Sequence, residues 1–269
     1  MIESLESIVL GTIQGITEWL PISSEGAMIL AKVRLFGSTE AIRELIHLAL
    51  FLHFGTFLAA LWYFREDVRH LLSAFFTYPV ARQESKNIIL FLVIATAASG
   101  AVGLGLLFLL EGIEERIAMG GKAATAFIGV LLLVTAGLQF RAKGRKSATK
   151  GVLDLRPLDG LLLGVVQGLS VLPGLSRSGL TISALLLRRF DEVQALRLSF
   201  LMSMPAILGG NILLNREEFH VSLAGILGVV FAFFFGLLTI HFLLRIARKV
   251  SFAYFTLLFG ILTMLSLLI

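Results

Sequence analysis

One polar, broken stretch occurs twice in this chain, at residues 14–26 and again at residues 167–179. The first copy reads Gln-Gly-Ile-Thr-Glu-Trp-Leu-Pro-Ile-Ser-Ser-Glu-Gly, and the second reads Gln-Gly-Leu-Ser-Val-Leu-Pro-Gly-Leu-Ser-Arg-Ser-Gly. Both lie inside apolar segments, yet each contains a proline, hydroxyl side chains and a charge. Broken backbone and charge are costly in lipid and persist mainly where they line a polar cavity. We therefore expect the two copies to build one site together.

The composition places the chain in the membrane class. Hydrophobic residues make up 57% of it and charged residues 15%, and the mean hydropathy is +0.91. Soluble domains contain about 25% charged residues. The apolar runs are long and continuous, which excludes the alternating strands of a β-barrel. The chain has no cysteine, so disulfides and thiol chemistry are excluded. The composition predicts an all-α integral membrane protein.

Six apolar segments are long enough to cross a bilayer, at about 20 residues each. They are residues 45–64, 88–110, 123–140, 196–214, 221–244 and 252–269. Two further apolar stretches, residues 8–35 and 158–187, contain the repeated motif and are expected to enter and leave the membrane on the same face.

Loop charges decide which face each stretch enters. Sixteen of the 23 basic residues, including those of a predicted loop over residues 65–87, fall on one side if residues 158–187 form a hairpin entering from that side. The positive-inside rule makes this side cytoplasmic. Counting the membrane crossings back to the N-terminus then makes residues 8–35 a hairpin that enters from outside.

Matched positions of the two motifs are 153 residues apart. We therefore predict one polytopic domain with six transmembrane helices and two opposed re-entrant helical hairpins, related as an inverted-topology repeat. Repeat 1 covers about residues 1–140, repeat 2 covers about residues 155–269, and the basic linker 141–157 is cytoplasmic. The alternative is a chance similarity between two Gly- and Ser-rich apolar segments.

The first motif predicts a helix, a break and a second helix. Gln14 and Glu18 lie on one helical face, because positions i and i+4 are neighbours. Pro21 stops or bends this helix. Ser23 or Ser24 is a suitable N-cap for the next half-helix, whose free amides and dipole favour an anion.

The second motif predicts the matching arrangement with a cation added. Pro173 and Gly174 give the break, Ser176 the cap, and Gly179 a position for close backbone approach. Arg177 provides a planar fork suited to phosphate oxygens. Two helix N-termini, several hydroxyls and one arginine together predict a phosphate cradle.

Glu18 does not fit simple anion binding. A carboxylate beside a phosphate requires either a divalent cation between them or a proton to transfer. We therefore expect Mg²⁺ or Ca²⁺ at Gln14 and Glu18. In the alternative interpretation Glu18 pairs with Arg177 as a structural bridge.

Other polar residues have equally simple structural explanations. Ser176 and Thr181 would pack helices, Glu25 would favour a helix dipole, and His53 would bond a backbone carbonyl.

These motifs resemble those of the undecaprenyl-diphosphate phosphatase family, the bacitracin-resistance type. Residues 14–24 resemble its (E/Q)xxxE and Pro-x-Ser-Ser elements, and residues 173–181 resemble its PGxSRSxxT element. Together with the Leu-His-Phe-Gly-Thr segment at 52–56, they cover essentially the whole chain. The resemblance implies a multi-pass enzyme of the plasma membrane, open to the extracytoplasmic side and able to form a homodimer. It would remove the terminal phosphate of a polyprenyl diphosphate and so recycle the lipid carrier for envelope glycan assembly.

The resemblance and the motif chemistry together give three sets of site residues. The expected catalytic residues are Glu18, Ser24, Arg177, Ser23 and Glu25. The expected phosphate-binding residues are Ser176, Ser178, Gly179, Thr181 and Gly26. The expected metal ligands are Gln14 and Glu18.

One residue departs from the pattern that the resemblance implies. The family's first motif usually continues Ser-Ser-x-Gly-His, whereas this chain has Ala27 at the last position. This leaves Ser24 as nucleophile or water-orienting group, with Glu18 or Glu25 as base or cation ligand. Two further functions stay open: a flippase or transporter of a polyprenyl phosphate, or a lipid-binding homologue without turnover.

Overall fold

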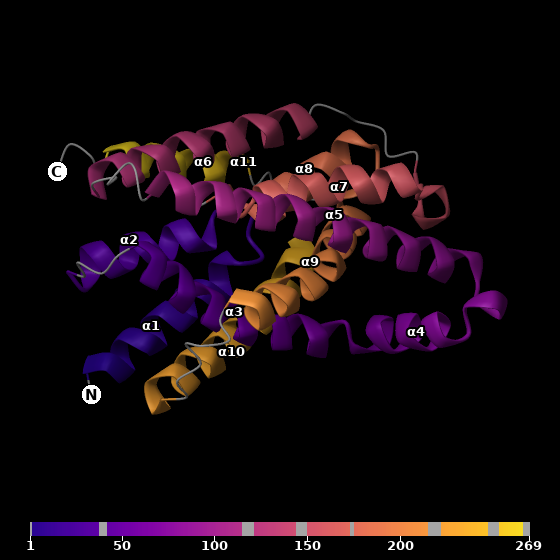
Figure 1. The fold of residues 1–269 in the computed structure, drawn as a ribbon, viewed down its shortest axis with the longest axis horizontal. Helices are drawn as coiled ribbons and strands as arrows, with labels where there is room; N and C mark the ends of the chain where they lie inside the picture. The colour runs from indigo at the N-terminus through magenta and orange to yellow at the C-terminus, as the bar shows by residue number, and fades with distance from the viewer. Residues whose placement is uncertain are drawn as a thin grey trace.

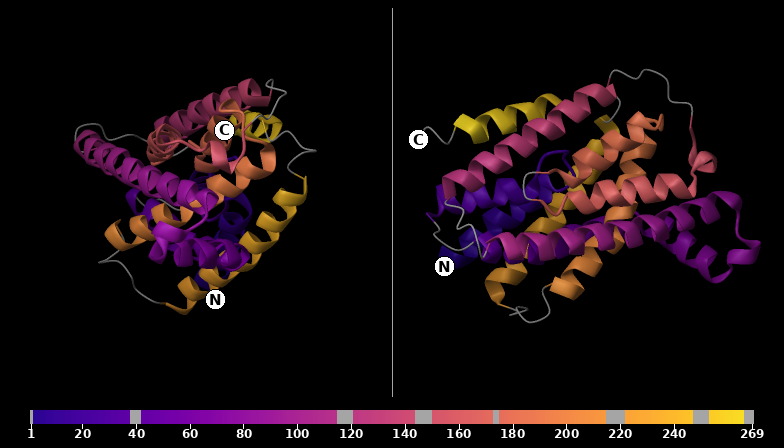
Figure 2. Two further views of the ribbon diagram at one scale, coloured as in Figure 1. Left: turned by 90° about the vertical axis from the view of Figure 1, so that its right-hand side faces the viewer. Right: turned by 45° about the horizontal axis from the view of Figure 1, so that its top comes forward.

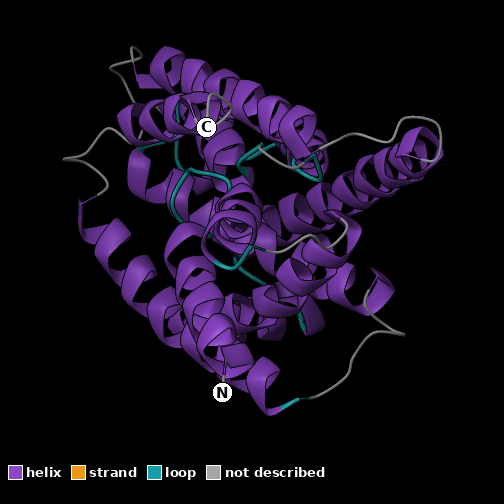
Figure 3. Ribbon diagram, turned by 90° about the vertical axis from the view of Figure 1, so that its left-hand side faces the viewer, coloured by secondary structure: helices purple, strands orange, loops and turns teal. Residues whose placement is uncertain are grey.

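The structure is a computed structural model, and nearly all of it is helical (Figure 3). It describes residues 2–37, 42–114, 121–143, 150–172, 175–214, 222–246 and 253–265. The helices are α1 (Ile2–Thr17), α2 (Ser24–Leu35), α3 (Ile42–Tyr63), α4 (Arg65–Phe76), α5 (Gln83–Glu114), α6 (Gly121–Lys143), α7 (Pro157–Leu169), α8 (Arg177–Leu187), α9 (Glu192–Leu214), α10 (Leu223–Ile246) and α11 (Ala253–Leu265). Two short 3-10 turns, Tyr78–Val80 and Val152–Asp154, precede α5 and α7.

Three of the described helices are long and apolar enough to cross a membrane: α5, α9 and α10. A fourth candidate is α3 with α4, which together pass the same test but are bent by 79° at their junction. The predicted spans 123–140 and 252–269 fall on α6 and α11, whose described apolar parts are shorter, at Gly129–Ala142 and Thr256–Leu265. The chain is thus an all-helical, multi-pass membrane protein.

The predicted loop over residues 65–87 is wrong in its first half, because α4 occupies residues 65–76. Glu66 and Asp67 lie in its first turn, where a helix dipole favours negative charge. Val68 and Leu71 pack against the apolar core, whereas Glu66 and Arg69 are exposed. The helix is therefore amphipathic, and the charges that suggested a loop lie on its polar face.

Two helical hairpins meet in the middle of the molecule. The first consists of α1 and α2, and the second of α7 and α8. Figure 1 and the right-hand view of Figure 2 place α1 and α2 toward the end that holds the N-terminus, and α7 and α8 toward the opposite end. The turn of each hairpin points inward, so the two repeated motifs lie beside each other at the centre.

Glycines allow each hairpin to pack closely against a long helix. On α1, a Cβ at Gly11 would lie 2.1 Å from the Gly228 carbonyl oxygen of α10. On α7, a Cβ at Gly164 would lie 2.5 Å from the Ala95 carbonyl oxygen of α5. Small residues at helix contacts let backbones approach in this way. The two hairpins are thus held against α10 and α5.

The apolar core lies directly beneath the first turn. Trp19 is fully buried and meets Phe200 of α9 edge-on, with ring centroids 4.8 Å apart. Phe64 also packs against Phe200, with ring centroids 6.3 Å apart. Trp19 is therefore a packing aromatic, and it anchors the turn directly after Glu18.

Candidate active site

The first motif folds as predicted around its break. Gln14 and Glu18 share one face, since Gln14 Nε2 donates to Glu18 Oε2 at 2.9 Å. Helix α1 ends at Thr17, and the turn that follows contains Pro21. Ser23 is the N-cap of α2, because its Oγ accepts from the Gly26 amide at 3.1 Å.

The second motif repeats this cap. Ser176 precedes α8, and its Oγ accepts from the Gly179 amide at 3.1 Å. The predicted break at Pro173 and Gly174 lies outside the described residues. Both helices that follow the motifs therefore begin with a serine cap and present their N-termini at the centre of the molecule.

Hydrogen bonds join the two turns to each other and to their neighbours. Ser178 Oγ donates to the Leu20 carbonyl at 2.7 Å, and Ser176 Oγ donates to the Ile22 carbonyl at 3.0 Å. The Pro21 carbonyl accepts from Gln139 Nε2 of α6 at 2.8 Å and from Thr256 Oγ1 of α11 at 2.6 Å. Backbone groups freed by the break need such partners inside a membrane protein. The second motif therefore holds the first in its broken conformation.

Glu18 lies at the centre of this arrangement. Its Oε1 forms an ion pair with Arg177 Nη2. Its Oε2 faces three groups: Gln14 Nε2, Ser24 Oγ at 2.8 Å, and His53 Nε2 at 3.0 Å. The side chain is only 4% exposed. The carboxylate thus links both hairpins and α3.

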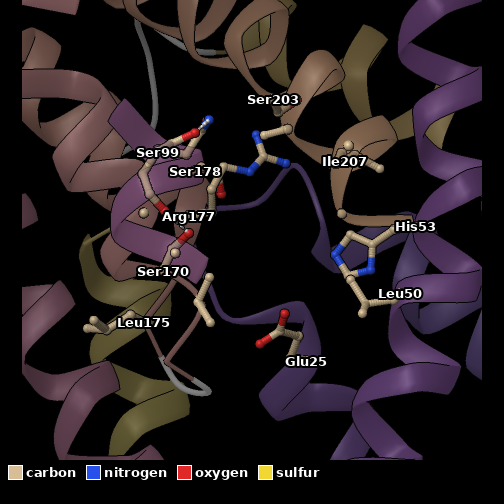
Figure 4. A pocket seen from close by; sticks show the side chains of 18 of the residues that line it. Glu25, Leu50, His53, Ser99, Ser170, Leu175, Arg177, Ser178, Ser203 and Ile207 are labelled. Carbon is tan, nitrogen blue, oxygen red and sulfur yellow. Dashed lines mark hydrogen bonds between the residues drawn. The ribbon is translucent and has the colours of Figure 1, made fainter. Parts of the chain in front are cut away.

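A cavity of about 310 Å³ opens beside Glu18. Figure 4 shows Glu25, His53 and Arg177 facing it from α2, α3 and α8. Within the described structure, Glu25 has no hydrogen bond or ion pair, and Arg177 Nη1 is buried without a hydrogen-bond partner. Along α5 the lining changes from Ser99 to Leu104, and along α9 it changes from Ser203 to Leu213. The cavity therefore has a charged end and an apolar end.

Most of the predicted site residues line this cavity: Glu18, Ser23, Ser24, Glu25, Ser176, Arg177 and Ser178. Gln14, Gly26, Gly179 and Thr181 do not. A Cβ at Gly179 would lie 2.7 Å from Gln139 Nε2, so the absence of a side chain here lets α6 pack closely against α8. Thr181 Oγ1 donates to the Arg177 carbonyl at 2.8 Å and lies 2.7 Å from Ser199 Oγ. Gly179 and Thr181 contact neighbouring helices.

Sequence reasoning missed His53 as a site residue. Its Nδ1 does bond a backbone carbonyl, that of Ala49 at 2.6 Å, as predicted. Its other nitrogen reaches Glu18, however, and the ring lines the cavity. The available signal was the Leu-His-Phe-Gly-Thr segment together with Ala27, where a histidine was expected and is absent.

A further polar group lines the cavity beyond Arg177. Gln167 Nε2 donates to Ser99 Oγ at 3.3 Å, and its Oε1 is buried without a partner in the described structure. Gln167 and Ser203 also line the cavity. They continue its polar surface toward the second hairpin.

Few oxygen donors at this cavity are available to a divalent cation. The described residues contain no group of three or more His, Asp or Glu side chains that could hold a metal alone. Mg²⁺ commonly takes one or two carboxylates and fills its shell with phosphate oxygens and water. Among the described residues, Glu25 has no hydrogen bond or ion pair, and Gln14 Oε1 is buried without a hydrogen-bond partner. The predicted ligand Glu18 already accepts from several donors.

Fold and site together define a class: a multi-pass helical membrane protein whose two broken hairpins enclose a charged central cavity. Residues 7–265 match the family model described as "Bacitracin resistance protein BacA". The chain belongs to this family, as its motifs predicted.

Proteins similar in sequence match nearly the whole chain. An undecaprenyl-diphosphatase from Methanococcoides burtonii is 44% identical over 273 residues, covering 99% of each chain. The protein of the same name from Methanothrix thermoacetophila is 37% identical, covering 97% of this chain and 96% of the relative. That from Haloarcula marismortui is 38% identical, covering 92% and 91%.

Proposed function

We propose that this protein hydrolyses undecaprenyl diphosphate, or a closely similar polyprenyl diphosphate, to the monophosphate and inorganic phosphate. The names of relatives at 34–44% identity support this activity. The observation that carries it is the arrangement of Ser24, Glu18 and Arg177 at one cavity: a hydroxyl donates to a carboxylate, and that carboxylate pairs with an arginine. These are a nucleophile, a base and a phosphate ligand.

The charged end of the cavity would bind the diphosphate. Arg177 keeps Nη1 free for a phosphate oxygen, and its guanidinium lies 5.5 Å from the centre of the Trp19 ring, which limits its orientation. The N-termini of α2 and α8 add free amides and positive dipole ends. The apolar end, lined by Leu104, Leu107 and Leu213, would receive the first part of the polyprenyl chain.

Ser24 would attack the terminal phosphorus. Its proton passes to Glu18 Oε2, toward which the hydroxyl is already directed. The bond between the terminal phosphorus and the bridging oxygen breaks, and the lipid monophosphate leaves. Glu18 gives its proton to the leaving monophosphate and is a carboxylate again. Water then attacks the phosphoserine and gives a proton to Glu18. The bond between Ser24 Oγ and phosphorus breaks, inorganic phosphate leaves, and Ser24 Oγ takes the proton back from Glu18. Glu18 and Arg177 serve both steps, as base and as ligand of the developing charge.

A bound Mg²⁺ or Ca²⁺ would neutralise phosphate charge, with Glu25 and Gln14 as the available oxygen donors. This replaces Glu18 of the predicted ligand pair by Glu25. Of the two donors named here, only Glu25 lines the cavity.

The hairpins would form an inverted-topology repeat with six membrane-crossing segments. The 153-residue offset of the motifs also relates Gly11 to Gly164 and Gly15 to Gly168. Each of these pairs packs on the long helix of the other half: α1 along α10, and α7 along α5. This exchange is expected if the chain comprises repeat 1 (about 1–140), the linker 141–157 and repeat 2 (about 155–269).

The same repeat would place the protein in the plasma membrane with its first hairpin entering from outside. This orientation is favoured because it places sixteen of the 23 basic residues on the cytoplasmic side. The diphosphate would then be reached from the extracytoplasmic side, where a lipid carrier that has delivered its glycan must be recycled.

Phosphate release from purified protein tests the activity. The protein in detergent micelles receives undecaprenyl diphosphate, and inorganic phosphate is followed before and after EDTA and after re-addition of Mg²⁺ or Ca²⁺. We expect one phosphate per lipid, loss with EDTA and recovery with the cation. The lipid monophosphate is the matched control and should release none. Lipid transfer between leaflets of a vesicle without phosphate release would instead support the flippase.

A further inference from the structure

We propose that His53 is a positioning residue for the reaction: it acts through Glu18, which it holds oriented toward Ser24. The inference rests on the proposed hydrolysis and assigns a role that the motif residues alone do not fill. Its basis is the contact between a buried histidine of α3 and the carboxylate at the junction of the two hairpins.

The acceptors around the ring determine where its hydrogens are. Nδ1 lies 2.6 Å from the Ala49 carbonyl, which can only accept, so Nδ1 carries a hydrogen. Nε2 lies 3.0 Å from Glu18 Oε2. That oxygen also faces Gln14 Nε2 and Ser24 Oγ. The Nε2 contact therefore lies on the carboxylate oxygen toward which the Ser24 hydroxyl is directed.

The backbone near His53 is firmly held, so the ring cannot easily leave Glu18. Two residues on, a Cβ at Gly55 would lie 2.4 Å from the Val229 carbonyl oxygen of α10, so α3 and α10 are in close contact there. Thr56 Oγ1 also donates to the His53 carbonyl at 2.9 Å. The ring itself is buried, and its side chain is 10% exposed.

The role of this contact appears when substrate arrives. Arg177 pairs with Glu18 in the free protein, but a diphosphate would compete for the same guanidinium. Without a second donor, the Glu18 carboxylate would then be free to turn away from Ser24. His53 stays on Oε2 and lets Arg177 turn to the phosphate. Glu18 thereby keeps the geometry in which it accepts the Ser24 proton.

Two substitutions separate this role from simple filling of space. His53→Gln places an amide Nε2 near the position of the imidazole Nε2 and so keeps a donor to Glu18. His53→Phe keeps a ring but removes both donors. His241 is the matched control, because it lies on α10, contacts Tyr63 at 3.4 Å and does not line the cavity.

The kinetic prediction is a split between kcat and KM. Since general-base catalysis contributes about 10²- to 10⁴-fold, His53→Phe should lower kcat by about 10- to 100-fold, with KM changed by less than about threefold. His53→Gln should recover most of the lost kcat, and His241→Phe should match the parent. The proposal is overturned if His53→Phe keeps the parent kcat, or if His53→Gln is as impaired as His53→Phe.

A second measurement does not depend on turnover. In protein labelled with ¹⁵N-histidine, the His53 signals are identified by their loss in His53→Gln. Glu18→Gln should shift the Nε2 signal, because Nε2 contacts the Glu18 carboxylate. An Nε2 signal that is insensitive to Glu18→Gln contradicts the proposal. If the parent releases no phosphate, the proposed hydrolysis fails, while the nitrogen signals still decide whether His53 contacts Glu18.

Discussion

Glu18 and Arg177 are 159 residues apart in the chain, yet they form an ion pair where the turns of the two hairpins meet. The pair is largely buried, with side-chain exposures of 4% and 14%. Removing one partner of such a pair typically costs about 3–5 kcal/mol, because the other charge is left buried and alone. The structural bridge considered from the sequence therefore exists.

The bridge does not exclude a role in the reaction. Arg177 Nη1 is buried without a hydrogen-bond partner in the described structure, and Glu18 accepts a hydrogen bond from the Ser24 hydroxyl. One contact can thus hold the two hairpins together in the free protein and be exchanged for substrate phosphate during turnover. The variants below separate these roles.

The two adjacent serines should respond differently to alanine. Ser24→Ala removes the proposed nucleophile, so kcat should fall by at least about 10²-fold with stability nearly unchanged. Ser23→Ala removes the N-cap of α2 and should cost about 1 kcal/mol of stability. Phosphate release and thermal unfolding in detergent check both. A Ser24→Ala protein with the parent kcat would assign the attack to another group.

Glycine substitutions test the packing of the hairpins. Gly11→Ala and Gly164→Ala introduce a Cβ within 2.1 Å and 2.5 Å of a backbone oxygen, so each should destabilise the fold by about 1–3 kcal/mol. Gly137 of α6 has nothing within 4 Å of its Cβ position, so Gly137→Ala is the matched control. It should leave the unfolding temperature unchanged or raise it, as alanine favours helix. Equal unfolding temperatures for all three variants would argue against the close packing.

Much of each motif could be predicted from local rules. The i, i+4 spacing placed Gln14 beside Glu18, and the serine caps follow from the preference of a helix N-terminus for hydroxyl side chains. The contact between Glu18 and Arg177 was the alternative interpretation of these two opposite charges, and the structure shows it. These features depend on a few neighbouring residues or on one repeated pattern, so the sequence contains them.

Contacts between helices far apart in the chain could not be predicted in this way. Whether His53 faces the cavity or another helix depends on how α3 rotates between α10 and α9, which no local rule specifies. Likewise, α4 follows α3 after a bend of 79°, and its charges resembled those of a loop. Gly179 was expected beside phosphate, but the structure places it in close contact with α6.

Cysteine labelling tests the direction in which the first hairpin enters the membrane. The chain has no cysteine, so each introduced thiol is unique. Leu5 and Leu35 are both exposed near the open end of the first hairpin. In Leu5→Cys and Leu35→Cys, an impermeant maleimide should label the new thiol on intact cells. Leu153→Cys, in the turn before α7, should react only after lysis. Labelling of Leu5→Cys and Leu35→Cys from opposite sides would mean that the segment crosses the bilayer.

The most direct test of the account compares phosphate release by the parent protein with that of Glu18→Ala and Arg177→Ala, using undecaprenyl diphosphate. Arg69→Ala is the control, because Arg69 is 75% exposed and pairs only with Glu66 of its own helix in the described structure. Loss of an electrostatic ligand costs about 3–4 kcal/mol of transition-state stabilisation, so both site variants should be at least about 10²-fold slower. Arg69→Ala should release phosphate at the parent rate. Release at the parent rate by Glu18→Ala and Arg177→Ala, in folded protein, would contradict the assignment of this cavity as the active site.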